Sequence, residues 1–131
     1  MKNNKYSILL NTALTHHNQG KIELADKIYV EVLSQDPENF SANQLHGIAL
    51  CQQIKYKDAI PYLEKAYAVD QKNYEVNNNL GLAYKGLQSF EKSKKYFLSA
   101  IKIDSNNFRA YFNYANLLAD NELYDEAIQY F

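Results

Sequence analysis

The chain is poor in residues that interrupt regular structure or cross-link it. Its 131 residues include one cysteine, two prolines, four glycines and no tryptophan. The lone cysteine, Cys51, has no partner for an internal disulfide, which excludes a disulfide-rich secreted scaffold and is typical of a reducing compartment. Because glycine and proline mark most forced turns, their scarcity favours long helices with short connections over many short strands.

An excess of either charge is also missing. Lys and Arg total 14 against 15 for Asp and Glu, Arg109 is the single arginine, and the formal net charge is -1. This balance gives no electrostatic reason to expect nucleic acid or an anionic membrane as partner. No apolar run approaches the roughly 20 residues of a membrane span, and Ile8–Leu10 is too short for the apolar part of a secretory signal. We expect a cytoplasmic protein.

What the chain does have is an internal period of 34 residues. Aromatic residues recur at that spacing, as do asparagines that close three blocks, two sets of small residues and one set of large apolar residues. These sets are Tyr6, Phe40, Tyr74 and Phe108; Asn39, Asn73 and Asn107; Ala13, Gly47, Gly81 and Ala115; Ala25, Ala59, Ser93 and Ala127; and Tyr29, Leu63, Phe97 and Phe131. Matched small and large positions indicate a repeat protein whose small residues let helices pack closely.

Each block is predicted to form two antiparallel helices. Apolar residues recur at helical spacing within the blocks, and short polar breaks fall at 18–20, 52–55, 86–89 and 119–122. Asp36 before Pro37 disfavours continued helix at the end of the first block. Pro61 is expected near the first turn of the second helix of block two, where its missing N–H costs little. The predicted fold class is all-α.

This pattern resembles the tetratricopeptide repeat, in which Leu-Gly and Tyr are followed by Ala, an aromatic residue and Pro. Block three carries it as Leu80-Gly81, Tyr84, Ser93 and Phe97. Residues that depart from the pattern are Thr12 and His46 in place of Leu, and Gln71 and Ser105 in place of Pro. The resemblance implies a right-handed α-solenoid of antiparallel helix pairs.

The implied domain organisation is a single array over 1–131, with repeats at 6–39, 40–73 and 74–107 and a partial fourth at 108–131. Such arrays usually end with a polar-faced capping helix, and none follows the fourth block in this sequence. We therefore expect either the N-terminal fragment of a longer protein or an end that a second copy buries as a homo-oligomer.

By the same resemblance, the first helix of each repeat lines a concave groove that binds a peptide segment or a partner helix. The groove residues we expect to bind are Leu10, Asn11, Leu14, Gln44, Ile48, Asn78, Asn79, Lys85, Arg109, Phe112, Asn113 and Asn116. Specificity is expected from Leu10, Leu14, Ile48, Phe112 and Arg109. The alternative for the leucines is that they pack internally.

Three groove asparagines, Asn11, Asn79 and Asn113, share one column, in which Leu45 is the interruption. An Asn amide offers an acceptor and two donors, so a row of them can hold a peptide backbone. The row resembles the asparagine ladder in the repeat domain of O-linked N-acetylglucosamine transferases, which Asn116 also matches. The alternative is that these asparagines only solvate an open groove.

Catalysis has little support in the sequence. His16 and His17 diverge on a helix and do not readily chelate one ion, His46 occupies a core column, and no phosphate loop or hydrolase motif occurs. We expect no catalytic residue, metal or cofactor. The predicted function is that of a protein-interaction module, and the alternatives are the substrate-recognition arm of a larger enzyme, such as a glycosyltransferase, or a self-assembling scaffold.

Overall fold

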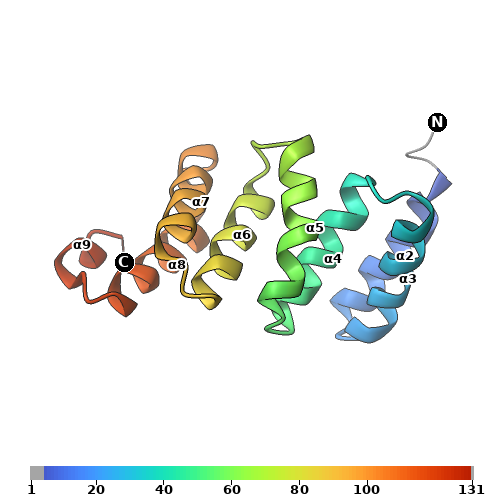
Figure 1. Cartoon of the computed structure of the whole chain (residues 1–131), viewed down its shortest axis with the longest axis horizontal. Coiled ribbons are helices and arrows are strands. Elements are labelled where there is room, and N and C mark those ends of the chain that lie inside the picture. Colours follow the sequence, from blue (N-terminus) through green and yellow to red (C-terminus); the bar gives the residue numbers. More distant parts are fainter. Residues whose placement is uncertain (1–4, 131) are drawn as a thin grey trace. The chain divides into compact units, whose positions relative to one another are not determined.

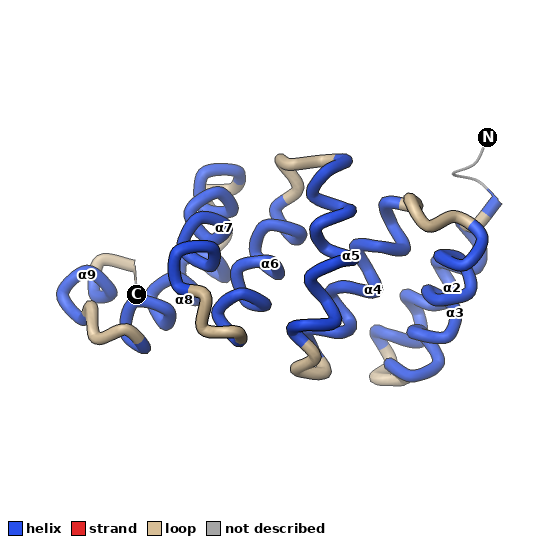
Figure 2. The backbone as a smooth tube through the Cα atoms, in the orientation of Figure 1, coloured by secondary structure: helices blue, strands red, loops and turns tan. Residues whose placement is uncertain are grey.

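A computed structural model describes residues 5–130, except for the side chains of 124 and 125. In that range the chain forms helices and no strands, joined by short loops (Figures 1 and 2). The helices are α2 (Ser7–Asn18), α3 (Ile22–Gln35), α4 (Phe40–Gln52), α5 (Tyr56–Val69), α6 (Tyr74–Gly86), α7 (Phe90–Ile103), α8 (Phe108–Asp120) and α9 (Tyr124–Ile128). The predicted all-α class is confirmed, and the predicted polar breaks overlap the loops within each helix pair.

The helices group into two compact units, Met1–Val69 with α2 to α5 and Asp70–Phe131 with α6 to α9. In the first unit, one core cluster joins α2, α3 and α4 through residues that include Tyr6, Ala13 and Tyr29. In the second unit, Phe97 of α7 packs with Tyr114 and Leu118 of α8 and with Ala127 of α9. Each unit thus has apolar packing of its own.

Close packing within the central helix pairs depends on two glycines. A Cβ on Gly47 of α4 would lie 2.6 Å from Cγ of Leu63 in α5, and a Cβ on Gly81 of α6 would overlap the Phe97 ring in α7. The second set of small residues is buried as well, and Oγ of Ser93 donates to the Gly81 carbonyl at 2.8 Å. Large residues therefore fit directly against the opposing backbone, as the repeated columns predict. Phe131, the last large member, lies outside the described residues.

The asparagines that close the blocks start the next helix. The side-chain oxygen of Asn39 accepts the N–H of Ala42 at 2.9 Å, and that of Asn73 accepts the N–H of Val76 at 2.9 Å. Asn107 accepts from the N–H of Arg109 at 3.1 Å. Each side chain satisfies a donor that has no partner within its own helix, which is the usual role of an N-cap asparagine.

Two other asparagines, Asn43 and Asn77, brace the loops between helix pairs. Asn43 Nδ2 donates to the carbonyls of Pro37 at 2.9 Å and Asn39 at 3.0 Å. Asn77 repeats this arrangement with the carbonyls of Gln71 at 3.0 Å and Asn73 at 2.8 Å. These bonds tie the start of α4 and of α6 to the loop before each helix. The sequence analysis missed this role, although the two residues share the 34-residue spacing.

Pro61 lies deeper in its helix than the sequence predicted. Helix α5 begins at Tyr56, so Pro61 falls in the second turn rather than near the first. The Ala59 N–H already bonds the Lys55 carbonyl at 3.0 Å, which means that the helical hydrogen bonds start before the proline. The missing N–H therefore removes a bond from the helix interior, and the expectation of a nearly cost-free position is wrong.

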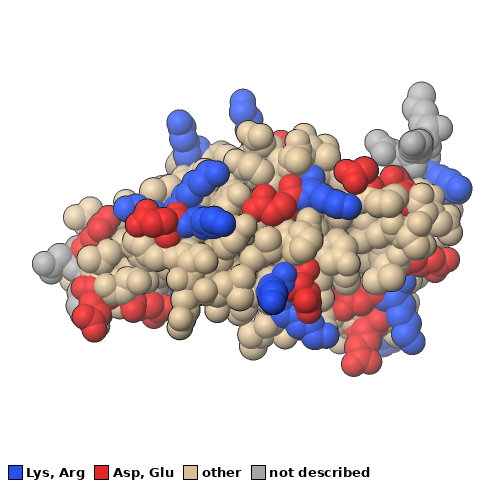
Figure 3. All heavy atoms as spheres, in the orientation of Figure 1, with Lys and Arg blue, Asp and Glu red and all other residues tan. Residues whose placement is uncertain are grey.

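Helix α7 is amphipathic. It buries Ser93, Tyr96, Phe97 and Ala100 and leaves three lysines exposed. These lysines, Lys92, Lys95 and Lys102, form what we call the α7 lysine face. Basic side chains gather over α7 on the side of the molecule shown in Figure 3.

The turn inside each helix pair contains one residue with positive φ. Gly20 has φ 79°, Ile54 62°, Gln88 60° and Glu122 62°, and these positions follow the 34-residue period. Glycine adopts this conformation freely, whereas a β-branched residue is strained there. Only the first of the four turns has the residue that this backbone favours.

Replacing Ile54 with Gly is expected to raise the free energy of unfolding by about 1 kcal/mol, because strain is removed and little packing is lost. The Ile54 side chain is 73% exposed. Urea denaturation followed by circular dichroism measures the change. Gly20→Ala is the control, because it introduces a side chain at the equivalent positive-φ position. No atom lies within 4 Å of an added Cβ there, so backbone strain alone should lower the free energy of unfolding by about 1 kcal/mol. A loss of stability in Ile54→Gly would contradict this account.

Candidate functional site

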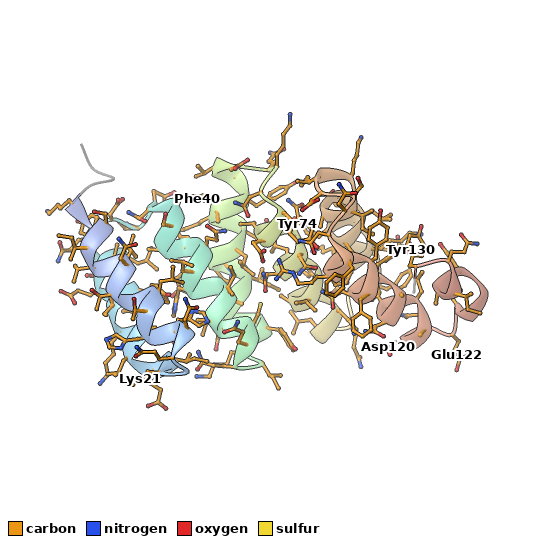
Figure 4. The ribbon with its side chains drawn as sticks, turned by 180° about the vertical axis from the view of Figure 1, so that it is seen from behind. Lys21, Phe40, Tyr74, Asp120, Glu122 and Tyr130 are labelled. Atoms are coloured by element: carbon orange, nitrogen blue, oxygen red, sulfur yellow. The ribbon has the colours of Figure 1, made fainter. Side chains whose placement is uncertain are left out.

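In the second unit, three polar pairs join the first helices of the two repeats, α6 and α8. Glu75 pairs with Arg109, Asn113 Nδ2 donates to Asn78 Oδ1 at 3.0 Å, and Lys85 Nζ lies 3.5 Å from Asp120 Oδ2. We call this row the α6–α8 seam. Figure 4 labels Tyr74 and Asp120, which lie toward its two ends. The structure thus brings together Asn78, Lys85, Arg109 and Asn113, which the sequence analysis assigned to one groove.

Arg109 is held in place from two directions. Besides its pairing with Glu75, its guanidinium lies 5.5 Å from the centre of the Tyr74 ring. The Tyr74 hydroxyl in turn accepts the N–H of Ala110 at 2.9 Å. Hydrogen bonding to Glu75 raises the pKa of Arg109, whereas burial is the main cause that raises the pKa of Tyr74. One end of the seam is therefore a fixed cation between a carboxylate and an aromatic ring.

Three groove asparagines at or beside the seam, Asn78, Asn79 and Asn113, already bond to the protein. Asn78 and Asn79 are buried, and Asn79 Nδ2 donates to the Glu75 carbonyl at 2.8 Å. Asn113 and Asn116 are half-buried on α8. Because an Asn amide has only two donor hydrogens, these internal bonds reduce what the row offers to a peptide backbone.

An exposed aromatic side chain lies beside these polar groups. Phe112 is 53% exposed and lies about one helical turn from both Arg109 and Asn116 on α8. An aromatic ring at the surface next to fixed polar groups has the composition of a recognition site, since such sites combine apolar area with a few oriented donors and acceptors.

In the first unit, the corresponding helices α2 and α4 carry the apolar part of the predicted groove. Leu10 is 8% exposed and belongs to the core cluster, so most of its side chain packs inside the unit. Leu14 is 37% exposed and Asn11 is exposed, while Gln44 and Ile48 are half-buried. His17 Nε2 and Gln52 Oε1 form a hydrogen bond between the two helices. Leu14 and Ile48 are the apolar groove residues that remain accessible here.

A partly buried polar cluster lies between α3 and α4 of the same unit. Asp26 Oδ1 is 3.0 Å from His46 Nδ1, and Asp26 Oδ2 accepts from Gln53 Nε2 at 2.7 Å. The His46 ring also packs edge-on against Tyr62, with centroids 4.5 Å apart. Burial lowers the pKa of His46, against the opposing effect of Asp26. The lowered pKa fits a neutral histidine, and the hydrogen bond to Asp26 fits a structural role that holds the ring in place.

The lone cysteine lies in a poor environment for nucleophilic or metal chemistry. Burial raises the pKa of the Cys51 thiol to about 12, so the thiolate that attacks substrates or binds metals is scarce at neutral pH. Among the described residues, no group of three or more His, Cys, Asp or Glu side chains is placed to hold a metal ion. None of the described helices is both long and apolar enough to cross a membrane.

Comparison with known proteins identifies the family. Two family profiles described as tetratricopeptide repeat match the chain, one over residues 6–39 and 74–107 and the other over 96–129. The chain belongs to the tetratricopeptide repeat family. Members of this family are protein-interaction modules and typically not enzymes, and the chain is an interaction module of this kind.

The chain is also similar to a human protein and to solved structures. The chain is 31% identical over 97 residues to human trafficking protein particle complex subunit 12; the match covers 72% of the chain but 13% of that protein. A structure of MamA from Desulfovibrio magneticus RS-1 has a TM-score of 0.88 at 24% identity, with 93% of this chain and 69% of that one covered. The first tetratricopeptide domain of Spaghetti (RPAP3), bound to the HSP90 peptide SRMEEVD, has a TM-score of 0.81 at 22% identity, with 88% and 91% covered. These structures share the α-solenoid fold.

Proposed function

We propose that the chain binds a peptide segment of a partner protein along the α6–α8 seam. The observation that carries this proposal is the exposed Phe112 beside the fixed Arg109 and the half-buried Asn113. Phe112 supplies apolar area to a partner side chain, while the polar groups of the seam hold the peptide backbone or a partner carboxylate. Because Glu75 and Tyr74 already orient Arg109, its side chain loses less conformational entropy when a peptide binds.

The asparagines enter this proposal in a narrower form than a continuous ladder. Asn113 and Asn116 are half-buried and can still meet a peptide at their accessible edges. Asn79 is buried and donates to its own helix, so its main role is within the protein. Replacing Asn79 would therefore disturb folding as well as binding, which makes Phe112 the cleaner probe.

In the first unit, we propose that Leu14 and Ile48 contact an apolar side chain of a bound segment or of a partner helix. Leu14 is exposed on α2 and Ile48 is half-buried on α4. Asn11 is exposed at the surface of the same α2 helix, one turn before Leu14. Apolar contacts flanked by polar side chains suit an amphipathic partner.

The function proposed is non-catalytic and cytoplasmic. Its support is the family assignment together with Cys51 and His46, which are buried and whose neutral forms burial favours. The single cysteine also fits a reducing compartment.

A displayed random-peptide library selected against the intact chain tests the seam. Peptides enriched on the wild-type protein should bind Phe112→Ala about tenfold more weakly, because truncating an interface aromatic residue costs roughly 1 to 2 kcal/mol. Fluorescence anisotropy with the labelled peptides gives the dissociation constants. Leu87→Ala is the matched control, since Leu87 is an exposed apolar residue just after α6 and outside the seam. Equal affinity of Phe112→Ala and wild type for every enriched peptide would contradict the proposal.

A further inference from the structure

Positive charge is concentrated on one helix of an otherwise balanced chain. Between residues 85 and 102 the sequence contains Lys85, Lys92, Lys94, Lys95 and Lys102, and Glu91 is the only acidic residue in that stretch. Lys85 pairs with Asp120 at the seam, and the other four lysines lie on α7. Helical geometry places Lys92, Lys95 and Lys102 within one stripe, and all three are exposed.

Two of these lysines rest on an ordered aromatic pair. The Tyr84 and Tyr96 rings stack with centroids 5.7 Å apart and an interplanar angle of 4°. Lys92 Nζ lies 5.2 Å from the Tyr84 centroid, and Lys95 Nζ lies 5.0 Å from the Tyr96 centroid. Tyr96 is buried, so this stack is anchored in the unit. The contacts limit the motion of long side chains that would otherwise lose conformational freedom on binding a ligand.

The face has an apolar element as well as charge. Leu98 is 36% exposed and lies on the same outward side of α7 as Lys95 and Lys102. Within the described residues, Lys92 and Lys102 form no ion pair with a carboxylate. Glu91 is exposed four residues before Lys95 on the same side of α7, so the face carries three lysines, one carboxylate and a leucine. This excess of positive charge beside apolar area matches a protein segment that carries acidic side chains and some apolar area. It lacks the arginines and the extent expected of a nucleic-acid surface.

We propose that the α7 lysine face binds an acidic, Asp- or Glu-rich segment of a partner protein. The carboxylates of that segment pair with Lys92, Lys95 and Lys102, and Leu98 contacts its apolar atoms. This surface lies on the second helix of its repeat and is distinct from the α6–α8 seam, so the two can be tested separately.

The test uses the intact chain and a fluorescein-labelled peptide of alternating Glu and Ser, with the matched Gln and Ser peptide as a neutral control. Fluorescence anisotropy at low and at raised salt gives the affinities. The triple variant Lys92→Glu, Lys95→Glu, Lys102→Glu should bind the acidic peptide about tenfold or more weakly, because three attractive charge pairs become repulsive. Raised salt should weaken wild-type binding, since exposed pairs are screened.

A second triple variant controls for net charge alone. Lys21, Lys27 and Lys57 are exposed lysines of the first unit, and changing all three to Glu alters the total charge by the same amount. We expect this variant to bind the acidic peptide nearly as the wild type does, with helical circular dichroism confirming that both triple variants fold. Equal losses in both triple variants would overturn the proposal. So would equal wild-type binding of the neutral peptide, or a preference for a DNA oligonucleotide or for phosphatidylserine vesicles over the acidic peptide.

Discussion

Gly81→Ala is expected to lower the free energy of unfolding by about 2 kcal/mol. The added methyl group on α6 would overlap the ring of Phe97, a residue of α7 that is fully buried. An aromatic ring enclosed on all sides has no rotamer that moves it aside, and overpacking of this kind costs about 1 to 3 kcal/mol or more. The better helix propensity of Ala offsets about 1 kcal/mol of that cost. Urea denaturation monitored by circular dichroism measures the net effect.

Two further variants separate packing from propensity. Gly86→Ala lies at the exposed end of the same helix and should be neutral or slightly stabilising, because only the propensity changes there. Phe97→Leu combined with Gly81→Ala should lose less than the two single changes added together, since the smaller side chain leaves room for the methyl group. If Gly81→Ala gained stability as Gly86→Ala does, the close approach of α6 and α7 at this point would be refuted.

Pro61→Ala is expected to raise the free energy of unfolding by about 2 kcal/mol. The proline sits in the second turn of α5, where it removes a main-chain hydrogen bond and its ring crowds the preceding turn. A proline inside a helix costs about 3 kcal/mol relative to Ala. Removing it also gives the unfolded chain more freedom, which lowers the gain in stability by about 0.4 to 1 kcal/mol. The side chain is exposed, so its removal forfeits little packing. The same denaturation experiment applies.

Pro37→Ala is the natural comparison. Pro37 lies in the loop between α3 and α4, where a fixed φ suits the native backbone, so its replacement should cost up to about 1 kcal/mol. The two prolines of the chain should therefore respond with opposite sign. A Pro61→Ala variant no more stable than the wild type would mean that α5 accommodates the ring without strain.

Sequence reasoning succeeded where a position is defined by size. Gly47 opposite Leu63, and Gly81 opposite Phe97, follow from columns that repeat every 34 residues. Such columns predict a helix pair because only one kind of packing satisfies every copy at once. The paired helices and the family assignment were therefore accessible from the sequence.

The same reasoning was weaker for polar residues, because spacing does not determine the direction of a side chain. Asparagine alone has three roles: Asn73 caps a helix, Asn77 braces a loop, and Asn113 pairs with Asn78. Composition made all of them look alike. The Glu75–Arg109 pair was easier to predict from the sequence, because the two opposite charges occupy the same position in adjacent repeats. Leu10 was placed by its column, whereas its burial depends on neighbours such as Tyr6 that belong to another part of the pattern.

The bracing asparagines also bear on how the array comes apart. Asn43 and Asn77 secure the starts of α4 and α6, but Tyr111 stands at the equivalent position of α8 and has no amide to donate to the preceding loop. Stacked repeats open locally rather than all at once, beginning where a junction has the fewest ties. A protease should therefore cut the loop before α8 sooner than the braced loops before α4 and α6.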